Sequence, residues 1–346
     1  MKIYLASYQT LMINRGGPTY KILSLKHTLE NMGIDVQLYD MWDYNLKFTD
    51  QDIIHIFNAN VHTYPMAINL KLYGAKYVVN PIFFSNHSAQ MIHMYRMLEA
   101  PFRKIFKRTY SDYFFTEYVC DNAEMVLPNT RDEGNLLCGA LGVKREKIQV
   151  IYNGVEERFA HADPSLFEKK YGLKDFILYV GHLGPVRKNG LNIIRALQKI
   201  DHPSVIIADI LNNEEGAACR EEIQKSKNIT HIHWLKHDDP LFESAYAACH
   251  TFILPTRYET PGRAALEAGL AGANVVITPY GGTREYFDTY AEYAEPSSIM
   301  SILKKTESAL NKEKSSELKD HILQNFLWDK IAKQTVEMYK HVLSDG

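Results

Sequence analysis

The stretch "TFILPTRYETPGRAALEAGLAGANVVITPYGG", residues 251–282, contains an apolar run, a loop, a helix-like segment and a second apolar run. The runs "TFILPT" and "NVVITP" contain β-branched residues bounded by turn residues, which predicts strands. The segment "GRAALEAGLAG" between them is helix-like in composition. A strand, a helix and a second strand in this order are typical of layers built on a parallel sheet. The stretch therefore predicts an α/β fold.

The same alternation continues along the chain. In the first half, strands are predicted at "KIYLAS", "DVQLYD", "DIIHIFN", "KYVVNP" and "EMVLPN", and an amphipathic helix at "TYKILSLKHTLENMG". In the second half, "FILYVGH", "SVIIAD" and "ITHIHW" are further predicted strands, and "GLNIIRALQKI", "EEGAACREEIQKS" and "DPLFESAYAAC" are predicted helices. This is the pattern of two successive Rossmann-like domains, which by itself selects no function.

A chain of 346 residues exceeds the size at which one hydrophobic core usually stops growing. The segment "IQVIYNGVEERF", residues 148–159, predicts a strand, an Asn-Gly turn and then a crossing between domains. We expect an amino-terminal domain at 1–152 and a carboxyl-terminal domain at 153–327. The helical pattern in "FLWDKIAKQTVEMYKHVL" predicts that residues 328–346 pack back on the first domain.

The composition excludes several classes of function. A formal net charge of −2 predicts no general affinity for nucleic acid. The cysteines lie far apart without ligand spacing, which indicates neither a zinc site nor a disulfide framework: Cys120, Cys138, Cys219 and Cys249. The start "MKIYLASYQT" has no long apolar region, and no run of about eighteen apolar residues occurs. These features predict a cytoplasmic protein.

Two loops that precede helices contain glycines or cations. Gly16 and Gly17 follow the first predicted strand, where backbone approaches an anion closely or simply makes a tight turn. Neither the GxGxxG fingerprint nor the GxxxxGK[ST] loop is present. Arg187 and Lys188 stand before a helix, where the helix dipole favours negative charge. A bound phosphate would balance them, and a solvated loop is the alternative.

The acids Glu259 and Glu267 stand eight positions apart on either side of Gly262. Glu259 is expected in the loop after a strand and Glu267 about one turn into the next helix, so they do not share one helix face. A carboxylate can hold vicinal hydroxyls of a ribose or hexose. Favourable charge near a helix start is the alternative. A metal site is disfavoured because no Asp or His cluster accompanies the acids.

These residues carry a family resemblance. The run "YETPGRAALEAGLAGANVVITPYGGTREY" resembles the donor-site signature of retaining glycosyltransferases of family 4 (glycosyl transferases group 1). That signature is an E-x7-E motif that continues into an EA-x-x-x-G helix and a Gly-Gly-x-x-Glu turn. The matching positions are Glu259, Glu267, Ala268, Gly272, Gly281, Gly282 and Glu285. The resemblance spans essentially the whole chain and is more specific in the carboxyl half. It implies the GT-B fold, in which two Rossmann-like domains face each other across a cleft and the carboxyl-terminal helix crosses back.

The resemblance implies a role for each matching residue. Glu267 would bind the ribose of a nucleotide, and Glu259 would contact the transferred sugar beside its reacting carbon. Backbone at Pro261, Gly262 and Arg263 would face the sugar and the diphosphate.

Four further residues would neutralise or approach the diphosphate: Lys188, Arg187, Gly16 and Gly17. The stretch around Leu235 would lie near the nucleobase. The donor would be a UDP- or GDP-linked sugar, with no further cofactor and no bound metal.

Two departures from the family pattern concern histidines. Many members have Gly-Arg at the start of the phosphate loop of the second domain, whereas this chain has Gly181 and His182 there. The loop is also one residue longer than the commonest form. Many members also place a sugar-contacting His after the strand that matches "KYVVNP", where this chain has Ile82. His87 nearby is a candidate replacement, and an ordinary loop histidine is the alternative reading.

The family transfers a sugar with retention of anomeric configuration, by front-face attack that requires no dedicated protein base. A saccharide or a lipid-linked molecule would be the acceptor, as in surface polysaccharide synthesis. Residues 91–108, "MIHMYRMLEAPFRKIFKR", form a basic amphipathic segment interrupted by Pro101. Such a segment suits peripheral contact with the inner face of a membrane, and a solvated helix face is the alternative. A nucleotide-sugar epimerase, a phosphorylase, and a non-catalytic sugar-nucleotide-binding subunit remain alternative functions.

Overall fold

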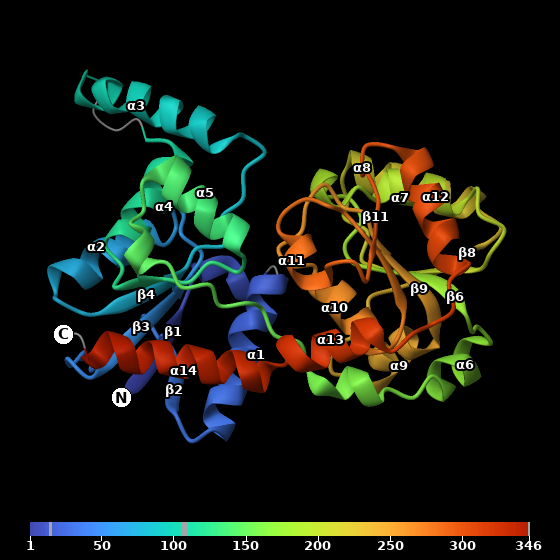
Figure 1. The fold of residues 1–346 in the computed structure, drawn as a ribbon, viewed down its shortest axis with the longest axis horizontal. Coiled ribbons are helices and arrows are strands. Elements are labelled where there is room, and N and C mark those ends of the chain that lie inside the picture. The colour runs from blue at the N-terminus through green and yellow to red at the C-terminus, as the bar shows by residue number, and fades with distance from the viewer. Residues whose placement is uncertain (14–15, 106–109, 345–346) are drawn as a thin grey trace. The chain divides into compact units, whose positions relative to one another are not determined.

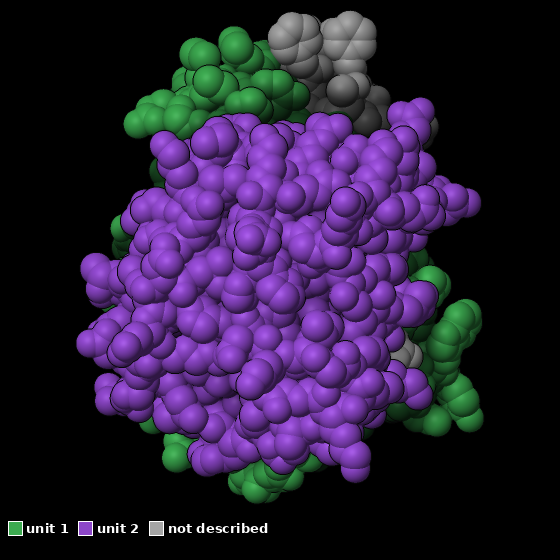
Figure 2. Space-filling model, turned by 90° about the vertical axis from the view of Figure 1, so that its right-hand side faces the viewer, with its two compact units in different colours: residues 1–154, 328–346 green, residues 155–327 purple. Residues whose placement is uncertain are grey.

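The computed structural model describes residues 1–13, 16–105 and 110–344. The chain divides into two compact units, which are coloured separately in Figure 2. Unit 1 comprises residues 1–154 with 328–346, and unit 2 comprises residues 155–327. Each unit is described by itself.

Unit 1 is built on a parallel sheet of five strands in the order β2-β1-β3-β4-β5. The strands are β1 (Lys2–Ala6), β2 (Asp35–Leu38), β3 (Asp52–Phe57), β4 (Tyr77–Asn80) and β5 (Met125–Val126). The helices are α1 (Gly17–Asn31), α2 (Tyr64–Leu72), α3 (Ala89–Ile105), α4 (Asp112–Asp121), α5 (Arg131–Leu141) and α14 (Trp328–Ser344). Parallel strands joined through helices make this unit Rossmann-like.

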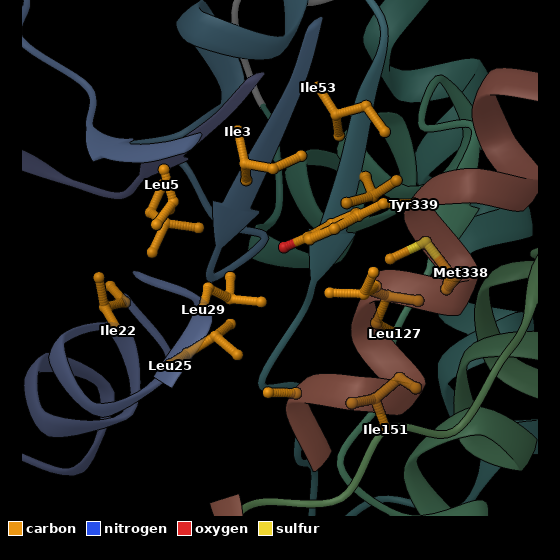
Figure 3. Packing of buried hydrophobic residues seen from close by; sticks show 14 of the residues in the cluster. Ile3, Leu5, Ile22, Leu25, Leu29, Ile53, Leu127, Ile151, Met338 and Tyr339 are labelled. Atoms are coloured by element: carbon orange, nitrogen blue, oxygen red, sulfur yellow. The ribbon is translucent and has the colours of Figure 1, made fainter. Parts of the chain in front are cut away.

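Both faces of this sheet are covered, so its central strands β3 and β4 are buried at every position and mostly apolar. On one face Ile3 and Ile53 pack with Leu29 of α1 and with Met338 and Tyr339 of α14 (Figure 3). The opposite face packs against residues of α2, α4 and α5. The carboxyl-terminal helix α14 therefore completes the core of unit 1, as the fold class predicts.

Unit 2 is built on a parallel sheet of six strands in the order β11-β10-β9-β6-β7-β8. The strands are β6 (Phe176–Val180), β7 (Ser204–Ile207), β8 (Ile229–Ile232), β9 (Cys249–Leu254), β10 (Asn274–Ile277) and β11 (Glu292–Tyr293). The helices are α6 (Ser165–Tyr171), α7 (Gly190–Leu197), α8 (Glu214–Lys225), α9 (Pro240–Ala248), α10 (Arg263–Leu270), α11 (Thr283–Phe287), α12 (Ile299–Leu310) and α13 (Glu317–Asn325).

In unit 2 the strand order reverses between β6 and β9, which are neighbours in the sheet. Helices α7, α8 and α12 lie on one side of the sheet, and α6, α9, α10 and α13 on the other (Figure 1). In an open parallel sheet, ligands bind outside the carboxyl ends of the strands at such a switch point. The loops that follow β6 and β9 are therefore the expected position of a site.

Two local expectations are wrong. The strand predicted in residues 148–151 is extended backbone outside the sheet's strands: Ile148 forms an isolated bridge with Val126, and the N–H groups of Gln149 and Ile151 donate to the carbonyl oxygens of Val126 and Pro128. Pro101 does not interrupt the segment as expected, because helix α3 continues through it. A proline removes the donor for the carbonyl four residues earlier, which belongs to Met97. Met97 is exposed, so water can satisfy that carbonyl.

Candidate functional site

The loops after β6 and β9 are joined by hydrogen bonds at the switch point. The buried Asn189 donates its Nδ2 to the carbonyl oxygens of Pro255, at 2.9 Å, and Pro296, at 2.8 Å. The backbone N–H of Arg257 donates to the carbonyl oxygen of Arg187 at 2.9 Å. Asn189 stands directly before α7 and follows the two cations, so the hydrogen bond of its side chain to Pro255 positions those cations against the loop after β9.

Arg187 and Lys188 both form ion pairs with the carboxylate of Glu259. Lys188 Nζ is 2.7 Å and Arg187 Nη1 is 3.2 Å from Glu259 Oε1. Burial alone would raise the pKa of Glu259, but the charges of Lys188 and Arg187 outweigh burial and hold that pKa below its ordinary value. Burial lowers the pKa of Lys188, and the attraction of Glu259 offsets this only in part. The cluster is thus a buried ionised carboxylate between two cations.

Glycines let the backbone crowd around Glu259. Gly281 has a φ of +91°, and a Cβ there would lie 2.3 Å from the carbonyl oxygen of Glu259. The N–H of Glu259 in turn donates to the carbonyl oxygen of Tyr280 at 3.1 Å. Gly262, with a φ of +87°, precedes α10 and contributes no capping side chain. The start of α10 therefore offers N–H groups next to the cations, which is an arrangement suited to an anion.

Glu267, one turn into α10, is almost fully buried, with 3% of its side chain exposed. Its Oε1 lies 3.1 Å from both His237 Nε2 and Arg263 Nε. Its Oε2 accepts from the Tyr246 hydroxyl at 3.0 Å. Burial raises the pKa of Glu267, but Arg263, His237 and Tyr246 together hold it below its ordinary value. An ionised Glu267 is therefore held from three sides.

His182 and Leu235 lie at the carboxyl ends of β6 and β8. The imidazole of His182 stacks on the indole of Trp234, with ring centroids 5.1 Å apart and an interplanar angle of 7°. His182 Nδ1 is buried and lacks a hydrogen-bond partner among the described residues. Leu235 follows Trp234 and is half-buried. His182, which stands where many family members have arginine, is thus stacked on Trp234.

The remaining predicted residues belong to unit 1. Gly16 caps α1, and a Cβ at Gly16 or Gly17 would meet nothing within 4 Å, so neither glycine is required by packing inside the unit. His87 is exposed, and its N–H donates to Ser85 Oγ at 3.1 Å. Ile82, in the position of the family histidine, has a φ of +52°, which is rare for a β-branched residue.

Helix α3 carries an exposed apolar row at helical spacing: Met91, Met94, Tyr95 and Leu98. The opposite side contributes the buried Ile92 and Arg96, which forms ion pairs with Glu99 and Glu117. The predicted basic residues of this segment lie beyond: the side chains of Arg103 and Lys104, and the whole of Lys107 and Arg108, are outside the described residues. No helix in the described ranges is long and apolar enough to cross a membrane.

Two family models match the chain. The model described as glycosyl transferases group 1 matches residues 166–325, and the model described as glycosyltransferase family 4 matches residues 15–159. Together they cover both units, and the first contains the whole of the cluster around Glu259 and Glu267.

The chain belongs to this glycosyltransferase family. An uncharacterized glycosyltransferase of Methanocaldococcus jannaschii is 25% identical over 225 residues, which are 59% of this chain and 56% of that protein. A D-inositol 3-phosphate glycosyltransferase of Mycolicibacterium paratuberculosis is 24% identical over 176 residues, 48% of this chain and 39% of that protein. The chain thus spans about half the length of the curated relatives it matches.

Solved glycosyltransferase structures share the fold. A sucrose-phosphate synthase of Thermosynechococcus elongatus superposes with a TM-score of 0.75 at 14% identity, covering 100% of both chains. HepE of Anabaena, in complex with UDP and glucose, gives a TM-score of 0.69 at 17% identity and covers 99% of this chain and 100% of HepE. At these identities the likeness shows the GT-B fold alone.

The sequence motifs of the glycosyltransferase do not reveal every residue in the site. Asn189, His237 and Tyr246 have no place among the predicted site residues, yet they hold the loops and Glu267 in position. The sequence feature that could have pointed to His237 is its position in the loop "WLKHDDP", between the end of β8 and the start of α9. The described residues contain no group of three or more His, Cys, Asp or Glu side chains that could hold a metal ion.

Proposed function

We propose that this chain transfers a sugar from a nucleotide-diphosphate sugar to an acceptor with retention of configuration and without a metal ion. The observation that supports this most is the cluster in which Arg187 and Lys188 hold Glu259 beside the glycine start of α10. It offers positive charge and helix N–H groups to a diphosphate, and a carboxylate to the sugar.

Binding of the donor exchanges the partners of these charges. In the structure, Lys188 and Arg187 contact the carboxylate of Glu259, and Arg263 contacts that of Glu267. A diphosphate carries more negative charge than either carboxylate, so it attracts the three cations. The two carboxylates then become available to sugar and ribose hydroxyls.

The reaction breaks the bond between the anomeric carbon and the diphosphate oxygen, and the diphosphate keeps the electron pair. Lys188 and Arg187 stabilise its developing charge, and Glu259 stabilises the positive charge that develops on the sugar. The acceptor hydroxyl forms the new bond on the same face and gives its proton to the leaving phosphate. Backbone of Pro261, Gly262 and Arg263 lines the sugar and diphosphate, and Leu235 and His182 lie toward the nucleobase.

From unit 1 we propose Gly16, Gly17 and His87 as further substrate contacts. The open space at both glycines and the exposure of His87 support this assignment. Replacing Gly17 with Val would fill that space and weaken donor or acceptor binding, whereas His87→Ala would raise the KM for the acceptor. Unchanged KM values in both variants would remove these residues from the site.

A thermal-shift panel of UDP, GDP and their sugar conjugates tests the donor assignment. A nucleotide that binds only the folded protein raises its melting temperature. We expect at least one member to do so, and Lys188→Ala to abolish the shift. No shift with any member would refute the donor site. Transfer or hydrolysis of the same donor then identifies an enzyme.

Ile82 at the position of the family histidine supports a second candidate, a non-catalytic subunit that binds sugar nucleotides. Tight donor binding without turnover across saccharide and lipid-linked acceptors would favour that candidate. A change of donor sugar in the absence of acceptor would instead indicate an epimerase.

We also propose that the enzyme works in the cytoplasm, in surface polysaccharide synthesis, with α3 resting on the inner face of a membrane. The exposed apolar row of α3 and the basic residues that follow it in sequence support this contact. Leu98→Glu should reduce co-sedimentation with anionic liposomes, and Leu72→Glu, at an exposed leucine of α2, should not. Absence of binding by the unaltered protein at low salt would refute the membrane contact.

A further inference from the structure

His237 connects the carboxylate of Glu267 to a second charged cluster. Its Nε2 faces Glu267 Oε1 at 3.1 Å, and its Nδ1 faces Arg158 Nη2 at 3.3 Å. Arg158 donates from the same Nη2 to the carbonyl oxygen of His237 at 2.6 Å and from Nε to Glu156 at 2.7 Å, and it forms an ion pair with Glu243. Apart from Glu267, none of these residues belongs to the family motif around Glu259.

Hydrogen-bond chemistry assigns the tautomer of this imidazole. A guanidinium can only donate, so the nitrogen that faces Arg158 must accept. The ring proton therefore lies on Nε2, where it points at the Glu267 carboxylate. The ring is also held by its neighbours, since its centroid lies 5.4 Å from that of Phe242 and 5.9 Å from that of Phe159.

The three partners of Glu267 leave little room for a ligand. A carboxylate has about four acceptor positions, two on each oxygen. Oε1 takes one hydrogen bond from His237 and is ion-paired with Arg263 Nε at 3.1 Å, and Oε2 takes one hydrogen bond from Tyr246. Because the Arg263 guanidinium lies against the second position of Oε1, only a position on Oε2 is open, and binding of two ribose hydroxyls requires one partner to leave.

Arg263 is the partner that can leave, because it lies in the first turn of α10, where a diphosphate would compete for it. His237 is held by Arg158 and by two aromatic rings, so it stays. We propose that His237 is a positioning residue that keeps Glu267 oriented toward the ribose while Arg263 moves to the diphosphate. This rests on the proposed function.

The test compares ribose recognition in the full chain carrying three alternatives at position 237. His237→Leu removes the donor to Glu267. His237→Gln retains a donor at the place of Nε2, and His237→Asn ends too short to reach Glu267. For each protein, calorimetry gives the dissociation constants of UDP and 2′,3′-dideoxy-UDP, and of the corresponding guanosine pair.

In the unaltered protein, loss of both ribose hydroxyls should weaken binding roughly tenfold or more, because hydrogen bonds to a charged group are lost. His237→Leu and His237→Asn should bring this ratio toward one without weakening the dideoxy nucleotide. His237→Gln should restore the ratio, which a merely structural role would not do. If His237→Leu fails to fold, His237→Asn carries the comparison.

Three outcomes overturn the proposal: an unchanged ratio in the Leu and Asn variants, equal weakening of both nucleotides, or a ratio near one in the unaltered protein. The last leaves the donor site intact, since the diphosphate still binds. Absence of binding by every nucleotide in the unaltered protein refutes the proposed function as well. The two failures are therefore distinguishable.

Discussion

Replacing Glu259 with Gln separates the two duties of this carboxylate. Glu259 neutralises Lys188 and Arg187, which lie 2.7 and 3.2 Å from its Oε1. Gln keeps the shape and one acceptor but leaves two adjacent cations without their counter-charge. We therefore expect the free protein to become less stable, nucleotide diphosphates to stabilise it more strongly than before, and sugar transfer to fall.

The size of each effect follows from the geometry. Removing one partner of a buried ion pair costs about 3 to 5 kcal/mol. The Arg187 side chain is 37% exposed, so water screens part of the repulsion and we expect about 2 to 3 kcal/mol. For a domain of this size that lowers the melting temperature by roughly 5 to 10 °C. Transfer should fall roughly a hundredfold or more, as for loss of one preorganised charge in an active site.

The assay combines differential scanning fluorimetry, with and without UDP and GDP, and a transfer assay on the same preparations. Glu292→Gln is a matched control, because Glu292 also lies between two cations of unit 2, Lys305 and Lys312. That variant should lose stability without any gain in the nucleotide response. If Glu259→Gln responds to nucleotide no more strongly than Glu292→Gln, the exchange of partners is refuted.

Three further predictions concern other parts of the chain. Gly281→Ala should lower the free energy of unfolding by about 1 to 3 kcal/mol and impair sugar transfer, because a Cβ at this position would lie 2.3 Å from the carbonyl oxygen of Glu259. Urea unfolding measures the loss of stability, and a transfer assay measures the loss of activity. Lys21→Met should lower the free energy of unfolding by about 3 kcal/mol, because it removes the buried cation that donates to Asn129 and whose charge attracts the buried Glu133. Adding Glu133→Gln should recover much of that loss in urea unfolding. Burial raises the pKa of Glu133 from 4.5 to about 7 and lowers that of Lys21 from 10.5 to about 7. The contribution of this pair to the free energy of unfolding should therefore decrease from pH 4.5 to 7 and increase again from pH 7 to 10.5. Unfolding curves measured across this pH range should show a minimum near pH 7 in the unaltered protein and none in the double variant.

Strands were easier to predict than helices because a parallel strand covered on both faces is a short apolar run. Strand β3, "DIIHIF", is buried at every position. Helices α2, α4 and α5 have no counterpart among the predicted elements. The aromatic-rich sequence of α4, "DYFFTEYVCD", has modest helix propensity, and Gly134 and Gly139 weaken the pattern of α5. Tertiary packing against the sheet overrides these local preferences.

The polar residues that surround the site are harder to predict than the motif itself. Sequence spacing places Glu259 before α10 and Glu267 within it, and the structure has both there. Sequence spacing cannot show that Lys188 contacts Glu259, because the two residues are 71 positions apart in the chain. Contacts of this kind depend on β6 and β9 being neighbours, a relation that the order of elements along the chain does not state.

The two glutamates differ in what a ligand must displace. Glu259 contacts both cations through one oxygen, Oε1, so their departure frees that oxygen, while the hydrogen bond from Thr256 to the carboxylate is unaffected. Glu267 retains His237 and Tyr246 even when Arg263 leaves, so its orientation survives the exchange. A carboxylate that stabilises a developing positive charge acts more strongly when no cation neutralises it. A carboxylate that recognises a ribose instead needs a fixed side-chain orientation. The two acids therefore differ in their surroundings in the way that the proposed roles require.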